Sequence, residues 1–222
     1  MLLRCARDHE LRTDAEKLRK AAGNIDRYMR DAAVSNSMDS LRGIEGNAAA
    51  EYFGAFDVLI LQNRGDFSFT GRNRRPPTDR VNAMLSFAYS LLSSMCAAAL
   101  RSTGLDPYVG FMHTDRPGRT SLALDLVEEL RASYADRFVL TLINNRVVNG
   151  DDFTIQDSGA VLLTDKGRKT FLSEWQKRKK ETLTHPFLKE KIEWGLVPYV
   201  QSLLLARTVR GDLDEYPPFF WK

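Results

Sequence analysis

Hydrophobic residues recur at intervals of three and four along most of the chain, a spacing typical of amphipathic α-helices. The first clear example covers residues 13–35, where Leu18, Ile25 and Met29 would share one face. Thr13 stands at the start of this pattern as a candidate N-cap. We therefore expect a long amphipathic helix near the beginning of the chain.

Two further helices follow from the same spacing. One is predicted to begin near Ser37. A second, long helix is predicted to run from Thr78 to Leu100, with Gly104 as the glycine that stops it from continuing. The long segment is apolar on most faces, so we expect it at the centre of the fold. The intervening residues 57–77 are irregular, basic and proline-rich, which predicts a surface loop.

The rest of the chain is also mainly helical in pattern. Helices are predicted over residues 121–134, from there toward 145, over 167–182 and over 185–210. Between residues 147 and 165 the pattern changes to alternation with glycine-containing turns, which predicts a short β-hairpin. The fold class we expect is mainly α, a single multi-helix domain over residues 1–222 with a short β-hairpin insertion.

Composition adds little to this picture. The chain has 222 residues, of which 43% are hydrophobic, and a net charge of +3, so a sizeable core is possible and nucleic acid is open as a partner. Cys5 and Cys96 lack the spacing of a zinc site and indicate reduced thiols. We find no signal peptide and no apolar run of bilayer length, so we expect a cytoplasmic protein without membrane contact.

The first residues, LLRCARDHEL, are helical in pattern from the second residue onward, without a capping residue in front. This opening favours a chain that begins inside a longer protein.

Two acids, Asp125 and Glu128, stand one turn apart in a leucine-rich helical stretch, which places them near the core. Such acids need a cation, and arginines could supply it in an ordinary structural ion pair. His113 lies just upstream, and a Pro-Gly turn between them lets its imidazole reach the same point. A histidine with carboxylates is a ligand set for Mg²⁺ or Mn²⁺, and a structural histidine is the alternative.

Glu45 is the candidate third ligand, because it stands among glycines and alanines on the second predicted helix. A boundary-position glutamate paired with Arg42 or another arginine is the alternative.

Basic residues form two groups that could bind phosphates. These candidate DNA-binding residues are Arg72, Arg74, Arg75, Arg80, Lys166, Arg168 and Lys169. Phe171 and Trp175 follow the second group and could stack on bases. The lysine run at 177–180 could extend this track, and a solvated helix face explains that run equally well.

Four stretches together resemble one family: LRGIEGNAAAEYF, RNRRPPTDRVNAMLSFAYSLL, GLDPYVGFMHTDRPGRTSLALDLVEELR and LTDKGRKTFLSEWQKRKKE. In this order and spacing they are similar to the CRISPR-associated endonuclease and integrase of the spacer adaptation module, with the type I-C branch the most similar. The resemblance covers essentially the whole chain.

The resemblance implies a metal-dependent catalytic domain. It places the metal ligands at Glu45, His113 and Glu128, an additional active-site acid at Asp125, and Mg²⁺ or Mn²⁺ as the cofactor. Many members of the family carry aspartate at the position of Glu128.

The resemblance also implies a reaction and partners. A DNA fragment (protospacer) is inserted into a CRISPR repeat array by direct transesterification, as part of antiviral defence. The family forms homodimers and assembles with a small ferredoxin-like partner protein, and its N-terminal β-rich domain is expected to be absent here. The alternatives are an inactive DNA-binding or assembly fragment, and a purely structural helical domain.

Overall fold

The computed structural model describes residues 1–114 and 116–220. Contacts divide the chain into two compact units. Unit 1 consists of Met1–Met84 and Val139–Gly167, and unit 2 of Leu85–Phe138 and Arg168–Lys222. The predicted mainly α class is confirmed, since helices dominate and the strands form two small antiparallel hairpins. The expectation of one catalytic domain stays a prediction, because this division reflects contacts and not independent folding.

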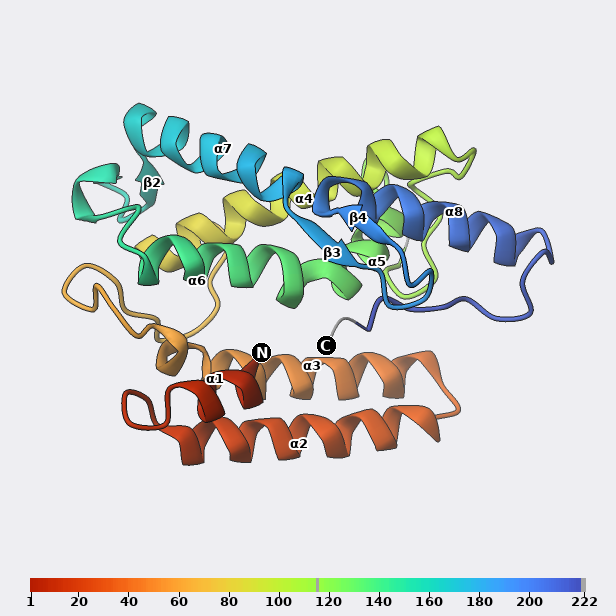
Figure 1. The fold of residues 1–222 in the computed structure, drawn as a ribbon, viewed down its shortest axis with the longest axis horizontal. Coiled ribbons are helices and arrows are strands. Elements are labelled where there is room, and N and C mark those ends of the chain that lie inside the picture. The colour runs from red at the N-terminus through yellow and green to blue at the C-terminus, as the bar shows by residue number, and fades with distance from the viewer. Residues whose placement is uncertain (115, 221–222) are drawn as a thin grey trace. The chain divides into compact units, whose positions relative to one another are not determined.

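Unit 1 begins with a helical layer. Its elements are α1 (Leu2–Asp8), α2 (Ala15–Ala33), α3 (Met38–Gly54), the 3-10 helices η1 (Phe56–Leu59) and η3 (Gly150–Asp152), and the strands β1 (Phe153–Ile155) and β2 (Val161–Leu163). Helices α2 and α3 lie side by side, and α1 packs on α2 (Figure 1). Strands β1 and β2 pair antiparallel, which confirms the predicted hairpin.

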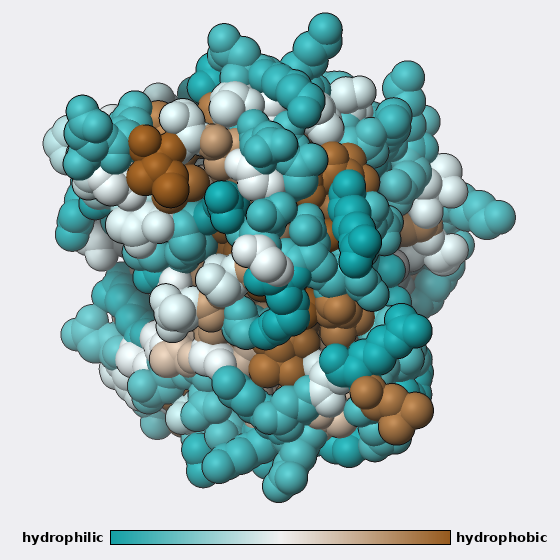
Figure 2. Space-filling view, turned by 90° about the vertical axis from the view of Figure 1, so that its left-hand side faces the viewer, coloured by the Kyte–Doolittle hydropathy of each residue, from teal (hydrophilic) through white to brown (hydrophobic). Residues whose placement is uncertain are grey.

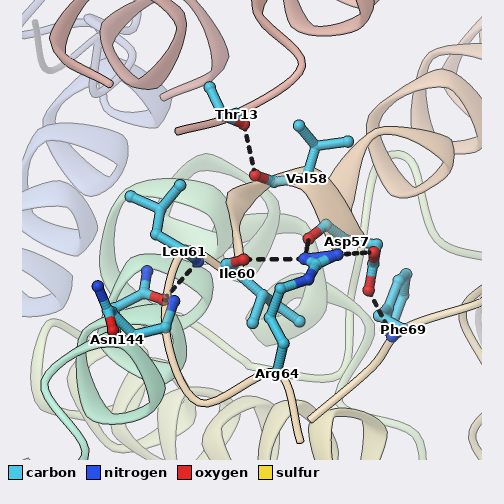
Figure 3. A network of polar contacts seen from close by, with 9 residues as sticks. Thr13, Asp57, Val58, Ile60, Leu61, Arg64, Phe69 and Asn144 are labelled. Atoms are coloured by element: carbon cyan, nitrogen blue, oxygen red, sulfur yellow. Dashed lines mark hydrogen bonds and ion pairs between the residues drawn. The ribbon is translucent and has the colours of Figure 1, made fainter. Parts of the chain in front are cut away.

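The helix starts of unit 1 are set by short polar side chains. Ser37 caps α3 as predicted, since its side chain accepts a hydrogen bond from the Ser40 amide. The cap of α2 is Asp14, whose carboxylate accepts from the Lys17 amide. Thr13, the predicted cap, instead donates to the carbonyl of Val58 at 2.7 Å and so ties the start of α2 to η1 (Figure 3).

The loop after α3 is irregular as predicted, and side chains fix its course (Figure 3). Asp57 pairs with Arg64 and accepts a hydrogen bond from the Phe69 amide at 2.8 Å. Asn144 Oδ1 accepts from the Leu61 amide, also at 2.8 Å. These bonds satisfy backbone groups that a loop cannot pair with itself.

Three helices have residues in both units: α4 (Arg80–Ser102), α6 (Arg137–Asn144) and α7 (Asp165–Lys180). Helix α4 is the long central helix of the prediction. Its cap is Asp79, which accepts from the Asn82 amide, one residue later than predicted. Gly104 ends it with a φ of 81°, a conformation that glycine adopts without strain.

The expectation that the chain has no apolar run of bilayer length is corrected at helix α4. By length and composition alone this helix is long and apolar enough to span a membrane. Its side chains Leu85, Leu92 and Leu100 are fully buried. Core helices of folded domains pass the same test, so this property is weak evidence of a membrane span.

Unit 2 carries the rest of the helices. Its elements are α5 (Ser121–Leu130), the π-helical η2 (Arg131–Asp136), β3 (Thr182–Thr184), β4 (Lys191–Glu193), the 3-10 helix η4 (Trp194–Leu196) and α8 (Val197–Val209). The predicted helix over residues 185–210 is therefore wrong in its first half, where β3 and β4 pair as a second hairpin. Pro186 disfavours a helix at that point, and Thr182 and Thr184 are β-branched.

Aromatic side chains form the core of unit 2. Phe171 and Trp175 on α7 are almost completely buried. Phe138 packs edge-on against both rings, and Tyr134 packs against Trp175. The hypothesis that Phe171 and Trp175 stack on bases is therefore wrong, because this core already covers their rings.

Candidate active site

The loop before α5 is fixed by one buried carboxylate. Asp125 Oδ2 accepts hydrogen bonds from the amides of Phe111 at 2.7 Å and Met112 at 3.2 Å, and Oδ1 accepts from the His113 amide at 3.0 Å. The Asp125 side chain has no exposed surface. Three backbone donors compensate the cost of burying it, so this acid needs no arginine.

The same carboxylate holds the imidazole of His113. The distance from His113 Nδ1 to Asp125 Oδ1 is 2.7 Å, and 23% of the histidine side chain is exposed. Because the carboxylate accepts, Nδ1 carries the proton, and Nε2 of the neutral ring presents its lone pair. Within residues 1–114 and 116–220, no hydrogen bond to Nε2 is present. Metal-binding histidines commonly have one ring nitrogen oriented by a carboxylate in this way.

Gly110 permits the close approach of loop and helix. A β-carbon at this position would lie 2.7 Å from Ser121 Cβ and 2.9 Å from both Asp125 Oδ2 and the His113 carbonyl oxygen. Real β-carbons do not approach other atoms so closely. Any larger residue would therefore push the loop away from the carboxylate that holds it.

Glu128, one turn after Asp125, has a different environment. Its two oxygens pair with the two terminal nitrogens of Arg131, each at 2.9 Å. The Arg131 guanidinium also lies 6.0 Å from the ring centre of Tyr89, whose hydroxyl is 2.5 Å from Asp136 Oδ1. This bidentate pair is the arginine partner that the structural alternative anticipated.

Glu45 belongs to unit 1 and is exposed on α3. Its neighbours Gly43 and Gly46 face open space, since a β-carbon on either would meet nothing within 4 Å. Arg42, the anticipated partner, pairs with Asp39 at 3.0 Å. The side chain of Glu45 is thus accessible to a ligand.

The predicted metal ligands are brought together only in part. Unit 2 joins His113 to Asp125 directly and places Glu128 on the same helix as Asp125, whereas Glu45 lies in the other unit. Among the residues that the structure describes, no three histidine, cysteine, aspartate or glutamate side chains form a group able to hold a metal ion. The ligand set Glu45, His113 and Glu128 remains a prediction.

The basic loop of unit 1 contains two kinds of arginine. Arg72 donates to Asn82 Oδ1 at 2.6 Å, and Arg80 donates to the Asp66 carbonyl at 2.7 Å, so both brace the fold. Arg74 and Arg75 are exposed. These two are the arginines of the loop best placed to contact phosphates.

The second basic group lies on the first turns of α7. Lys166, Arg168 and Lys169 are all exposed, and Lys166 approaches Asp152 at 3.5 Å while most of its side chain stays in solvent. The face of the molecule in Figure 2 is mostly hydrophilic, with separate hydrophobic patches. An exposed, flexible lysine or arginine can reach a phosphate without breaking any contact of the core.

Sequence reasoning did not single out Gly110 and Arg131. The Gly-Phe-Met-His order is a weak signal for Gly110, because the close approach depends on the path of the loop. Arg131 stands three residues after Glu128, a spacing that favours ion pairs on a helix. That spacing could have indicated the pair.

These features define a largely helical protein in which a buried carboxylate orients a loop histidine beside further acids. The family model for CRISPR associated protein Cas1 matches residues 1–177. The chain belongs to this family.

Relatives agree with this assignment. The chain is 54% identical over 226 residues to CRISPR-associated endonuclease Cas1 2 of Rhodospirillum rubrum, covering 100% of this chain and 66% of that protein. It is 48% identical to CRISPR-associated endonuclease Cas1 1 of Chlorobaculum tepidum, covering 100% of this chain and 64% of that protein. The chain thus spans somewhat less than two thirds of these relatives.

Solved structures show the same fold. A Cas1 protein from Thermotoga maritima matches with a TM-score of 0.75 and 29% identity, over 89% of this chain and 63% of that one. A casposase bound to integration product matches with a TM-score of 0.74 and 25% identity, over 84% of this chain and 55% of that one. A Cas6-RT-Cas1–Cas2 complex matches with a TM-score of 0.77 and 25% identity, over 100% of this chain and 24% of that one.

Proposed function

We propose that this chain is the catalytic part of a cytoplasmic, divalent-metal-dependent DNA endonuclease and integrase that inserts DNA fragments into a CRISPR repeat array. The observation that carries the proposal is the His113–Asp125 pair, which fixes one imidazole nitrogen and leaves Nε2 available. The names of the relatives and the casposase bound to integration product support this reaction class. Within the family, the quoted sequence motifs favour the type I-C branch.

The chemistry of the candidate side chains suits a Mg²⁺ or Mn²⁺ ion. An imidazole nitrogen and carboxylate oxygens form a suitable donor set, and we assign it to His113, Glu45 and Glu128. A cation held there would offset the negative charge that develops at the reacting phosphate. Glu128 can take part while it stays paired with Arg131, because each of its oxygens accepts one hydrogen bond and keeps a second lone pair.

Asp125 has the role of a positioning residue in this proposal. It holds the amides of Phe111, Met112 and His113, so it fixes both the backbone and the ring of the ligand. Its oxygens are fully engaged by these donors. We therefore assign it the orientation of His113 and not direct coordination.

The reaction we propose is one exchange of phosphodiester bonds. The 3′-hydroxyl oxygen of the fragment forms a bond to phosphorus while the bond between that phosphorus and its original 3′ oxygen in the repeat breaks. The attacking hydroxyl loses its proton to solvent, and the departing 3′ oxygen takes up a proton. Bond number is conserved, so the exchange needs no external energy source and no covalent protein intermediate. Hydrolysis, with water in place of the hydroxyl, gives the endonuclease activity.

The proposed partners are DNA, a second copy of the chain and the small ferredoxin-like protein of the adaptation module. The solved Cas6-RT-Cas1–Cas2 complex supports an assembly of this kind. Arg74, Arg75, Lys166, Arg168 and Lys169 supply exposed positive charge for the DNA backbone. Arg72 and Arg80 contribute indirectly by shaping the basic loop.

The test is cleavage and strand transfer on a branched DNA with Mn²⁺, Mg²⁺ or chelator. We expect metal-dependent products that are lost in His113→Ala and Glu128→Ala. His9→Ala is the matched control, because His9 ends α1 and has no role in the site. Binding of Mn²⁺, followed by electron paramagnetic resonance, should weaken in the first two variants only.

The bidentate Glu128–Arg131 pair gives Glu128 a structural role, which is compatible with one alternative, an inactive DNA-binding or assembly fragment. That alternative predicts DNA binding that is sensitive to salt, indifferent to Mn²⁺ and unchanged in His113→Ala. Such a result would reject the catalytic proposal.

A further inference from the structure

The loop that carries His113 also exposes large apolar side chains. Tyr108, Val109 and Phe111 are 42%, 61% and 58% exposed. Single exposed apolar residues are common on protein surfaces, so their exposure alone does not indicate a binding site. This loop, however, is held firmly on both sides of the exposed residues.

The anchors of the loop are backbone groups. On one side the carbonyl of Pro107 accepts from the amides of Leu122 and Ala123 at 3.0 and 3.3 Å, at the start of α5. On the other side the amide of Phe111 donates to Asp125 at 2.7 Å. The backbone that carries the aromatic side chains is thus held in place, which lowers the entropy cost of binding a partner.

The position of Phe111 identifies the kind of partner. It precedes His113 by two residues, so its α-carbon is within about 7 Å of the α-carbon of the proposed ligand. A phosphate at His113 would therefore bring a neighbouring nucleobase within reach of the Phe111 ring. Arg116, five residues after Phe111 in the sequence, is exposed and adds positive charge to this part of the chain.

We propose that Phe111, with Tyr108, forms a stacking platform for an unpaired nucleobase next to the reacting phosphate. Exposed aromatic rings beside positive charge are the means by which proteins hold single-stranded nucleic acid, because every base has an aromatic face. The inference rests on the proposed function and deepens it. The site would prefer a strand whose bases are unstacked at a branch or frayed end over a continuous duplex.

The experiment measures DNA binding in chelator, where no cleavage occurs, with 2-aminopurine either at the branch or inside a paired arm. Phe111→Ala should weaken binding of the branched DNA about tenfold and abolish the fluorescence change at the branch. Phe111→Trp should restore both. Val109→Ala is the matched control, because Val109 is at least as exposed in the same loop but has no ring. Thermal unfolding should be the same for all variants.

Each other outcome contradicts the inference in a recognisable way. Binding of branched DNA that is equal in wild type, Phe111→Ala and Phe111→Trp would overturn the stacking platform and leave the proposed function intact. Loss of self-association in Phe111→Ala, with DNA binding unchanged, would assign the surface to protein contact. Absence of DNA binding in the wild type would overturn the inference and the proposed function together.

Discussion

Two histidines of unit 2 are connected to acids on the same helix, α5, and they differ in what they leave open. His113 bonds directly to Asp125 through Nδ1, and no bond to its other nitrogen occurs in the described part of the chain. His185 is completely buried, and both of its nitrogens are used. Nδ1 accepts from the amides of Phe187 and Leu188, and Nε2 lies 3.1 Å from Gln201 Oε1.

The network around His185 is closed at its other end as well. Because Nδ1 accepts, Nε2 carries the proton and donates to Gln201 Oε1. The Gln201 amide then donates to Glu129 Oε2 at 2.9 Å and to the Tyr216 hydroxyl at 2.6 Å, and Glu129 also accepts from the Phe219 amide. This network ties the C-terminal segment to α5 and α8.

The difference shows which histidine is available for chemistry. A closed network satisfies every polar group and contributes to structure, whereas an oriented ring with a free nitrogen can receive a ligand. The acids Asp125 and Glu129 are four residues apart on one helix, so the closed network also helps to fix the helix that orients His113. The following predictions test this contrast.

The largest effect is expected from Asp125→Ala, which leaves the amides of Phe111, Met112 and His113 without their acceptor. We expect a loss of about 3 kcal/mol or more in the free energy of unfolding, measured in urea. Asp106→Ala is the control, because Asp106 is exposed and also accepts a hydrogen bond from a loop amide, that of Tyr108. A loss for Asp125→Ala no larger than that of the control would contradict its role as the anchor of the loop.

Gly110→Ala should have the next largest effect. The new methyl group would approach Ser121 Cβ to 2.7 Å, so the loop must shift. We expect a loss of about 1–3 kcal/mol, in the range of overpacked sites. The nitrogen chemical shifts of the His113 ring should also change, because its bond to Asp125 is disturbed.

The control for that change is the same substitution at Gly43. A β-carbon there meets nothing within 4 Å, and the residue lies inside α3. Gly43→Ala should therefore stabilise the protein by about 0.5–1 kcal/mol. If both glycine variants changed stability alike, the close approach at Gly110 would not limit the residue type.

The sequence indicated the site around His113 better than the network around His185. Periodicity placed Asp125 and Glu128 on a helix near the core, and the family resemblance selected His113. The roles of the acids depend on distances in space. Asp125 is satisfied by amides 12 to 14 residues away, and Glu129 by Gln201, 72 residues away.

Local signals explain the successes and failures of the fold prediction. Helices with strong apolar periodicity and short polar caps were predicted well: α2 was correct within about two residues at both ends, and α3 at its start. The strands of β3 and β4 are as short as those of the first hairpin, but this second hairpin was missed because no glycine marks the turn between its strands. The burial of His185 that accompanies this hairpin depends on contacts with α8 that no local pattern reveals.

The smallest expected effect is the pH dependence of the closed network. Burial lowers the pKa of His185 below its ordinary value of 6.5, so the native state binds fewer protons than the unfolded state below that pH. This contribution to stability is lost as the pH falls through 6.5. Burial raises the pKa of Glu129 above 4.5, so its contribution is greatest at low pH and is lost as the pH rises through the raised value.

The two groups therefore act in opposite directions in weakly acidic solution, and removal of either should reveal the other. In His185→Gln, the free energy of unfolding should rise more, or fall less, on acidification from about pH 7 to about pH 5 than in wild type. In Glu129→Gln it should fall more steeply over the same range. Urea midpoints across this range measure both slopes, and each variant serves as the control for the other. Identical slopes in wild type and both variants would mean that the network is open to solvent, and the contrast with His113 would then no longer hold.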